Sequence, residues 1–208
     1  MKFSTRADRI EPFYVMEIAK AAQEMARGCA DSDTPMIFLN IGEPDFTAPP
    51  LVQEAAARAI ADGRSQYTQA LGLPALREAI SGWYASRFGV DVDPGRIVIT
   101  AGASAALQLA CLALIDPEDE ILMPDPSYPC NRQFVQAAGG TAVLLPSGPD
   151  TRFQLSREQV EAAWGLDTCG VLLASPSNPT GTSIARAELE AIARSVRERG
   201  GVTLIDEI

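Results

Sequence analysis

Two polar residues follow apolar runs in the second half of the chain. Asn178 comes shortly after the run Val171–Ala174, and Asp206 lies near the end of the run that begins at Val202. The carboxyl ends of parallel strands meet at one edge of a sheet, where open α/β sheets bind ligands. An amide and a carboxylate there could bind one small molecule. Asn-Pro-Thr-Gly is also common in turns, and an acid often caps a helix or forms a salt bridge, so both roles stay open.

A third candidate is the turn Thr100–Ser104, which joins an apolar run to a helical pattern. Unpaired N–H groups and the helix dipole make a helix start a good phosphate site. The chain has neither a GxGxxG nor a Walker motif at this turn, so an ordinary strand-to-helix connection is the alternative. Tyr128 follows Asp125 and two turn residues, where an aromatic ring could simply cover the sheet end.

These residues resemble a known family. The stretch SPSNPTG followed by LIDEI is similar to the fold-type I enzymes that use pyridoxal 5'-phosphate (PLP). Within them it is most similar to the class I/II aminotransferases related to aspartate aminotransferase. Further motifs in the family's order extend the resemblance upstream: Asn40–Phe46, Tyr67–Arg77, Thr100–Ser104 and Asp125–Pro129.

The resemblance implies PLP as the cofactor and a role for each candidate. The Ala103 and Ser104 amides, with the Ser104 hydroxyl, would hold the phosphate. Tyr128 would stack on the pyridine ring, and Asn178 would donate to the phenolic oxygen. Asp206 would keep the pyridine nitrogen protonated, because a nearby carboxylate favours the charged form of a base. A protonated ring is a better electron sink.

Two further residues receive roles only from the resemblance. Tyr67 would reach the cofactor phosphate of a neighbouring subunit, which implies a homodimer with shared active sites. Gly42 would lie against the substrate, where a Cβ atom would intrude. Without the resemblance, Tyr67 is a core or interface aromatic residue and Gly42 a turn glycine.

The resemblance also implies a Schiff-base lysine, yet this chain has only Lys2 and Lys20, both in its amino-terminal arm. We therefore expect no catalytic residue here, and expect the chain to be the inactive amino-terminal half of a longer aminotransferase. The full enzyme would exchange an amino group between an amino acid and a 2-oxo acid. Three alternatives stay open: a PLP-dependent C–S lyase or synthase, a non-catalytic aminotransferase-like effector domain, and a nucleotide-binding module.

Alternating strand and helix patterns would position these residues. Helices are expected at Glu11–Arg27, Pro49–Asp62 and Pro74–Arg87, and helices then alternate with strands to the end of the chain. The strands are expected at Ile97–Thr100, Glu120–Met123, Thr141–Leu145, Val171–Ala174 and from Val202. Repeated βα units indicate a mostly parallel sheet covered on both faces.

The resemblance refines this into a three-layer α/β/α sheet of the fold-type I PLP-dependent transferase type. That sheet is expected to be incomplete in this chain and to carry an amino-terminal helical arm. Residues 1–48 are expected to form the arm and helix, as part of the small domain. Residues 49–208 would be the front part of the large PLP-binding domain.

Composition excludes several kinds of site. The chain has no histidine and four cysteines without CxxC spacing, which argues against a Cys/His metal site and against Ser-His or Cys-His catalysis. A net charge of −10 argues against nucleic acid as a partner. The apolar helix expected at Ala103–Ile115 is too short to span a membrane. With no apolar stretch typical of a signal peptide near Met1, the expected location is the cytoplasm.

Overall fold

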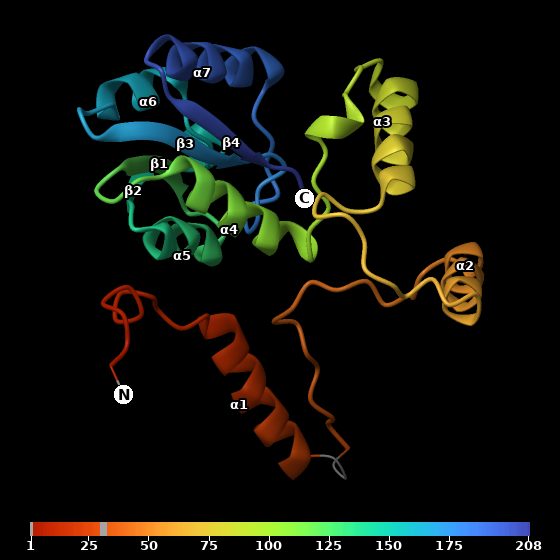
Figure 1. Ribbon diagram of the computed structural model, residues 1–208. Helices are drawn as coiled ribbons and strands as arrows, with labels where there is room; N and C mark the ends of the chain where they lie inside the picture. The colour runs from red at the N-terminus through yellow and green to blue at the C-terminus, as the bar shows by residue number, and fades with distance from the viewer. Residues whose placement is uncertain (1, 30–32) are drawn as a thin grey trace. The chain divides into compact units, whose positions relative to one another are not determined.

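The computed structural model describes residues 2–29 and 33–208 (Figure 1). The chain forms two compact units. The first unit combines the described residues up to Glu11 with Ala101–Ile208, and the second unit is Pro12–Thr100. The expected domain division after residue 48 stays a prediction.

The first unit is built on four parallel strands in the order β2–β1–β3–β4. Their bounds are Glu120–Asp125 for β1, Thr141–Pro146 for β2, Thr168–Ala174 for β3 and Val202–Asp206 for β4. Gly170 of β3 lies opposite Val202 of β4, and a Cβ atom on Gly170 would stand 2.5 Å from the Val202 carbonyl oxygen. The close pairing of these two strands therefore depends on a glycine at this position.

Helices cover both faces of this sheet, as Figure 1 shows. Successive strand residues face opposite sides, so β1 and β3 contribute to two separate cores. Helices α4 (Gly102–Leu114) and α5 (Pro129–Ala138) cover one face, where the core consists of Cys111, Ile121, Met123, Val135 and Leu172.

Helices α6 (Arg157–Ala163) and α7 (Arg186–Glu198) cover the other face. The core there consists of Leu122, Val160, Val171, Leu173, Ile192 and Val196. The predicted three-layer α/β/α arrangement with parallel strands is confirmed.

The chain changes direction across the sheet between β1 and β3. From β1 it moves outward to β2, and it then returns to β3 on the other side of β1. The connecting helices α5 and α6 pack on opposite faces. Such a switch opens a crevice at the carboxyl ends of the strands, which is where open α/β sheets bind ligands.

The second unit contains α1 (Tyr14–Gly28), α2 (Pro50–Ala61), α3 (Pro74–Phe88) and the single 3₁₀ turn η1 (Pro94–Arg96). Helix α1 begins three residues later than the expected start at Glu11. The residue before a proline is disfavoured in helical conformation, which applies to Glu11 before Pro12. The Glu11 N–H instead donates to Gln133 Oε1 of α5 at 3.1 Å. No helix in the described parts of the chain is long and apolar enough to cross a bilayer.

The expected strand at Ile97–Thr100 is wrong. The segment makes no strand pairing among the described residues, and the sheet contains only β1 to β4 there. Ile99 is instead tied to a loop, because its N–H donates to the Leu71 carbonyl oxygen at 3.1 Å. Gly72 lies beneath Ile99, where a Cβ atom would come within 2.5 Å of Ile99 Cγ1. The apolar pattern shows a preference for extended backbone, but a strand also needs a neighbour to pair with.

Candidate cofactor-binding site

A cavity of about 310 Å³ lies in the first unit, at the carboxyl ends of the strands. Five residues proposed from the sequence line it together: Ala103, Ser104, Tyr128, Asn178 and Asp206. Ala101, Gly102, Glu207 and Ile208 complete the lining. Residues from four separate stretches of the chain thus meet in one place.

The start of α4 forms one wall of this cavity. Gly102 has φ +82°, a left-handed conformation that favours glycine, and it turns the chain into the helix. The preceding residue, Ala101, makes no side-chain cap. The N–H groups of Ala103 and Ser104 belong to the first helical turn and so have no partner inside the helix. They give this wall a partial positive charge suited to an anion.

Asp206 stands at the end of β4. Its backbone is opposite Ala174 of β3, and its carbonyl oxygen accepts from the Ser175 N–H at 3.0 Å. Its half-buried carboxylate makes no hydrogen bond or ion pair within residues 2–29 and 33–208. Burial raises the pKa of this carboxyl above its ordinary value. The salt-bridge alternative is therefore not realised among the described residues, and a positively charged ligand group would relieve the cost of burying the charge.

Asn178 lies on the loop that follows β3. Backbone hydrogen bonds shape this loop: the Ser177 N–H donates to the Thr182 carbonyl oxygen at 2.8 Å, and the Gly181 N–H to that of Ser177 at 2.7 Å. The Asn178–Pro179 peptide is cis. The Asn178 side chain makes no hydrogen bond to any described residue, so the turn does not depend on its amide. The amide remains available for a ligand.

Tyr128 is half-buried at the start of α5. A hydrogen bond with the Cys130 side chain, burial, and the nearby charges of Cys130 and Asp206 raise the pKa of its phenol to about 12. The phenol is therefore neutral at physiological pH. Cys130 was not among the predicted site residues, and only its two-residue spacing from Tyr128 could have indicated the contact.

Tyr67 and Gly42 both belong to the second unit and are not among the residues that line the cavity. The Tyr67 side chain is fully exposed, at 106 %. No atom lies within 4 Å of the position that a Cβ on Gly42 would take. The roles expected for these two residues, across a dimer and against a substrate, stay predictions.

The groups in the cavity match the chemistry of PLP. An uncapped helix start with a serine hydroxyl suits a phosphate dianion, and a partly buried carboxylate suits a protonated ring nitrogen. The Asn178 amide and the Tyr128 ring also line the cavity. No lysine lines the cavity, and Lys20 is ion-paired with Glu17 at 2.7 Å.

Comparison with known proteins gives a consistent result. The pattern of the family Aminotransferase class I and II matches residues 34–208. A valine–pyruvate aminotransferase of Mycobacterium tuberculosis is 42% identical over 184 residues, covering 88% of this chain and 46% of that protein. An aspartate aminotransferase of Geobacillus stearothermophilus is 33% identical over all 208 residues and is 52% covered. The chain spans about half the length of the curated relatives it matches.

Solved structures agree on the fold. The crystal structure of an aminotransferase from Mycobacterium tuberculosis has a TM-score of 0.92 and 39% identity, with 100% of this chain and 52% of that chain covered. The aspartate aminotransferase from Thermus thermophilus with maleate also has a TM-score of 0.92, at 32% identity and 53% coverage of its chain. The sheet of four parallel strands is thus that of the fold-type I aminotransferases, and this chain belongs to the class I and II aminotransferase family.

Proposed function

We propose that the protein is a PLP-dependent aminotransferase, which exchanges an amino group between an amino acid and a 2-oxo acid, and that this chain supplies its PLP-binding cavity. One observation carries the proposal. The uncapped start of α4, the Asn178 amide and the Asp206 carboxylate line the same cavity, and neither side chain is engaged elsewhere in the described structure.

Each lining group has a distinct task in this proposal. The amides of Ala103 and Ser104, with the Ser104 hydroxyl, bind the phosphate. The Tyr128 ring would pack against the pyridine ring and exclude water from it. The Asn178 amide donates to the phenolic oxygen, and Asp206 holds a proton on the ring nitrogen by its negative charge. When bound, PLP supplies the electron sink for changes at the substrate's α-carbon.

Binding of PLP to the 208-residue chain tests this proposal. Titration followed by visible absorbance should show saturable binding. Asp206→Asn should weaken it by about 10- to 100-fold, roughly 1.4 to 2.8 kcal/mol, because the ring nitrogen loses its counter-charge. Ser104→Ala should weaken it by about tenfold. Asp91→Asn and Ser86→Ala are matched controls outside the cavity and should leave the affinity unchanged.

Binding by these residues alone should be non-covalent. The two lysines of the chain, Lys2 and Lys20, do not line the cavity. The chain is mixed with PLP, reduced with borohydride and analysed by mass spectrometry. No single lysine should then carry a stoichiometric phosphopyridoxyl group. We propose that the lysine which bonds PLP is neither Lys2 nor Lys20. One such adduct on this chain, together with amino acid turnover, would contradict that proposal.

A homodimer with shared active sites belongs to the same proposal. Its support is the fully exposed side chain of Tyr67 and the exposed apolar side chains of Met16, Ile18 and Met25 along α1. The proposed location is the cytoplasm. None of the four cysteines forms a disulfide bond in the described structure, as is usual in a reducing compartment.

A further inference from the structure

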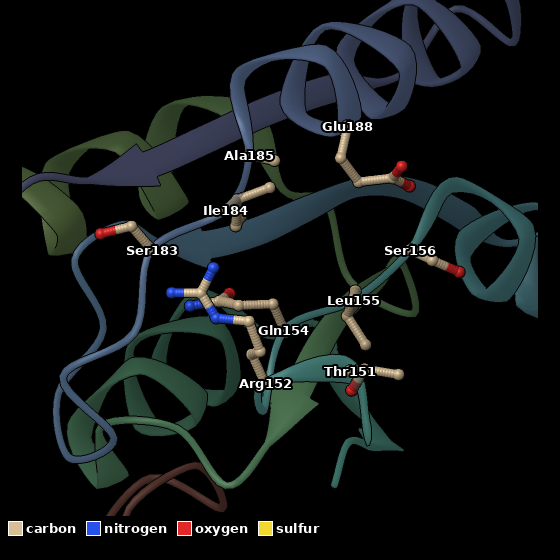
Figure 2. Close-up of a pocket in the computed structure, with 9 residues that line it drawn as sticks. All are labelled: Thr151, Arg152, Gln154, Leu155, Ser156, Ser183, Ile184, Ala185 and Glu188. Atoms are coloured by element: carbon tan, nitrogen blue, oxygen red, sulfur yellow. The ribbon is translucent and has the colours of Figure 1, made fainter. Parts of the chain in front are cut away.

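A second cavity, of about 280 Å³, lies in the first unit between the loop before α6 and the segment that leads into α7 (Figure 2). Its lining shares no residue with the cofactor cavity. Small-molecule pockets begin at roughly 300 Å³, so this one suits a ligand of only a few heavy atoms. Leu155 and Ile184 are buried in its lining, whereas several other lining groups are polar or charged.

A cationic group, the guanidinium of Arg152, lines this cavity. Figure 2 shows its side chain extending toward the segment that carries Ser183 and Ile184. Across the described parts of the chain, the guanidinium makes no ion pair and no side-chain hydrogen bond. Two nearby arginines, by contrast, are ion-paired: Arg157 with Glu158, and Arg186 with Glu190. Arg152 is thus left to bind an anionic group from outside.

A buried acceptor lines the same cavity. Gln154 is only 5% exposed, and its Nε2 donates to the carbonyl oxygens of Thr182 at 2.9 Å and Ala174 at 3.3 Å. These bonds fix the orientation of the amide, so its Oε1 points away from them. That Oε1 is buried and accepts no hydrogen bond from any described residue. A buried acceptor without a donor is unfavourable, and a ligand N–H that displaced the atoms now covering this oxygen would satisfy it.

An acidic group from the first turn of α7 completes the lining. Glu188 Oε1 accepts from the Arg157 N–H, which anchors the carboxylate between α6 and α7. The cavity therefore offers one cationic donor group, one neutral acceptor and one anion. A simple anion would suit Arg152 but would leave Gln154 Oε1 unsatisfied and would be repelled by Glu188. A simple cation would be repelled by Arg152.

We propose that this cavity binds a small free α-amino acid as its zwitterion. The ligand carboxylate pairs with the Arg152 guanidinium. The ligand ammonium donates to Gln154 Oε1 and faces the Glu188 carboxylate. Because Gln154 Nε2 also holds Thr182, the bound amino acid contacts the residue that supports the Asn178 loop.

Glycine is the probe that tests this site, since it is the smallest α-amino acid. Calorimetric titration of glycine into the PLP-free 208-residue chain should show saturable binding. Arg152→Gln should weaken it at least about tenfold, and Arg152→Lys should weaken it less, since it keeps the charge. Glu188→Gln keeps the acceptor for the Arg157 N–H but removes the negative charge. It should weaken the binding of glycine, and not that of acetate, because acetate has no ammonium group. Gln154 is left intact because it also supports the loop.

Two pairs of control variants distinguish glycine binding in this cavity from binding elsewhere on the chain. Arg186→Gln and Glu190→Gln remove exposed charges on the same helix outside the cavity, and they should leave glycine binding unchanged. Ser104→Ala and Asp206→Asn alter the cofactor cavity and should not affect it either. Absence of saturable glycine binding, or equal binding by Arg152→Gln and the unmodified chain, would overturn the proposal. Loss of binding in the cofactor-cavity variants would also overturn it.

Discussion

The Ser175 N–H donates to the Asp206 carbonyl oxygen at 3.0 Å. This bond continues the pairing of β3 with β4 by one residue beyond Ala174, which lies opposite Asp206. It joins the first residue of the Asn178 loop to the strand end that carries the Asp206 carboxylate. The sheet itself therefore fixes the start of the Asn178 loop beside the strand end that carries Asp206.

Asp206 should make stability depend on pH in the absence of cofactor. Burial raises the pKa of its carboxyl in the folded chain above the ordinary value of 3.8. As pH rises past 3.8, the unfolded state therefore loses this proton first, and the folded state loses relative stability. Asp206→Asn should match the unmodified chain at lower pH and become the more stable of the two at higher pH.

Thermal unfolding midpoints measured across the acidic range check this expectation. Asp91 is an exposed acid in the second unit, and Asp91→Asn is the control. The midpoint of Asp91→Asn should keep a constant difference from that of the unmodified chain as pH rises. If the midpoint difference between Asp206→Asn and the unmodified chain also stayed constant or decreased with rising pH, burial would not be the dominant influence on the pKa of Asp206.

Cys130 should control the titration of Tyr128. The hydrogen bond with the Cys130 side chain is the largest cause that raises the pKa of the phenol to about 12. Cys130→Ala should therefore lower that pKa toward its usual value near 10. Carbon NMR of isotope-labelled tyrosine can follow Tyr128 separately from the other tyrosines. Cys29→Ala, in the second unit, should leave the titration unchanged, and an unaltered pKa in Cys130→Ala would exclude the contact.

Gly102→Ala should destabilise the first unit although the site has room for a methyl group. No atom lies within 4 Å of a Cβ built on Gly102, but its φ of +82° is unfavourable for other residues. The expected cost is about 1 kcal/mol. Gly82→Ala is a matched control within α3, also with open space around its Cβ, and should stabilise its helix by about 1 kcal/mol. Denaturant unfolding distinguishes these opposite signs.

Tyr67→Phe tests the shared active site in the complete enzyme. In the proposed homodimer the Tyr67 hydroxyl would reach the phosphate of the neighbouring subunit, so its removal should weaken PLP retention by about tenfold without separating the subunits. Tyr84→Phe, in α3, is the control and should leave retention unchanged. A complete enzyme that remained monomeric in light scattering and kept full activity would rule out a site shared between subunits.

The sequence predicted the parts of the structure that depend on local pattern. Helix α6 is one of the helices that were expected to alternate with strands. It begins at a capping box, in which the Ser156 hydroxyl accepts from the Gln159 N–H and the Gln159 side chain accepts from the Ser156 N–H. Strands β1 to β4 follow from short apolar runs between helices. Asn178 and Asp206 could be brought together because parallel strands share a carboxyl edge.

Non-local features could not be predicted in the same way. The run Ile97–Thr100 has a strand pattern, but pairing depends on a neighbour that a local pattern does not specify. The buried Gln154 amide under the Asn178 loop depends on the fold of two distant segments. The Cys130 contact with Tyr128 depends on side-chain orientation at the start of α5. The first two features have no signature in residue type or spacing, and the only local sign of the third is the two-residue spacing of Cys130 from Tyr128.

The most direct test of the cofactor site is a crystal structure of the chain with PLP. We expect the phosphate at the amides of Ala103 and Ser104, with the ring nitrogen beside Asp206 and the phenolic oxygen at the Asn178 amide. PLP or its phosphate bound elsewhere, with the Gly102–Ser104 turn closed by packing, would contradict the proposed cofactor site.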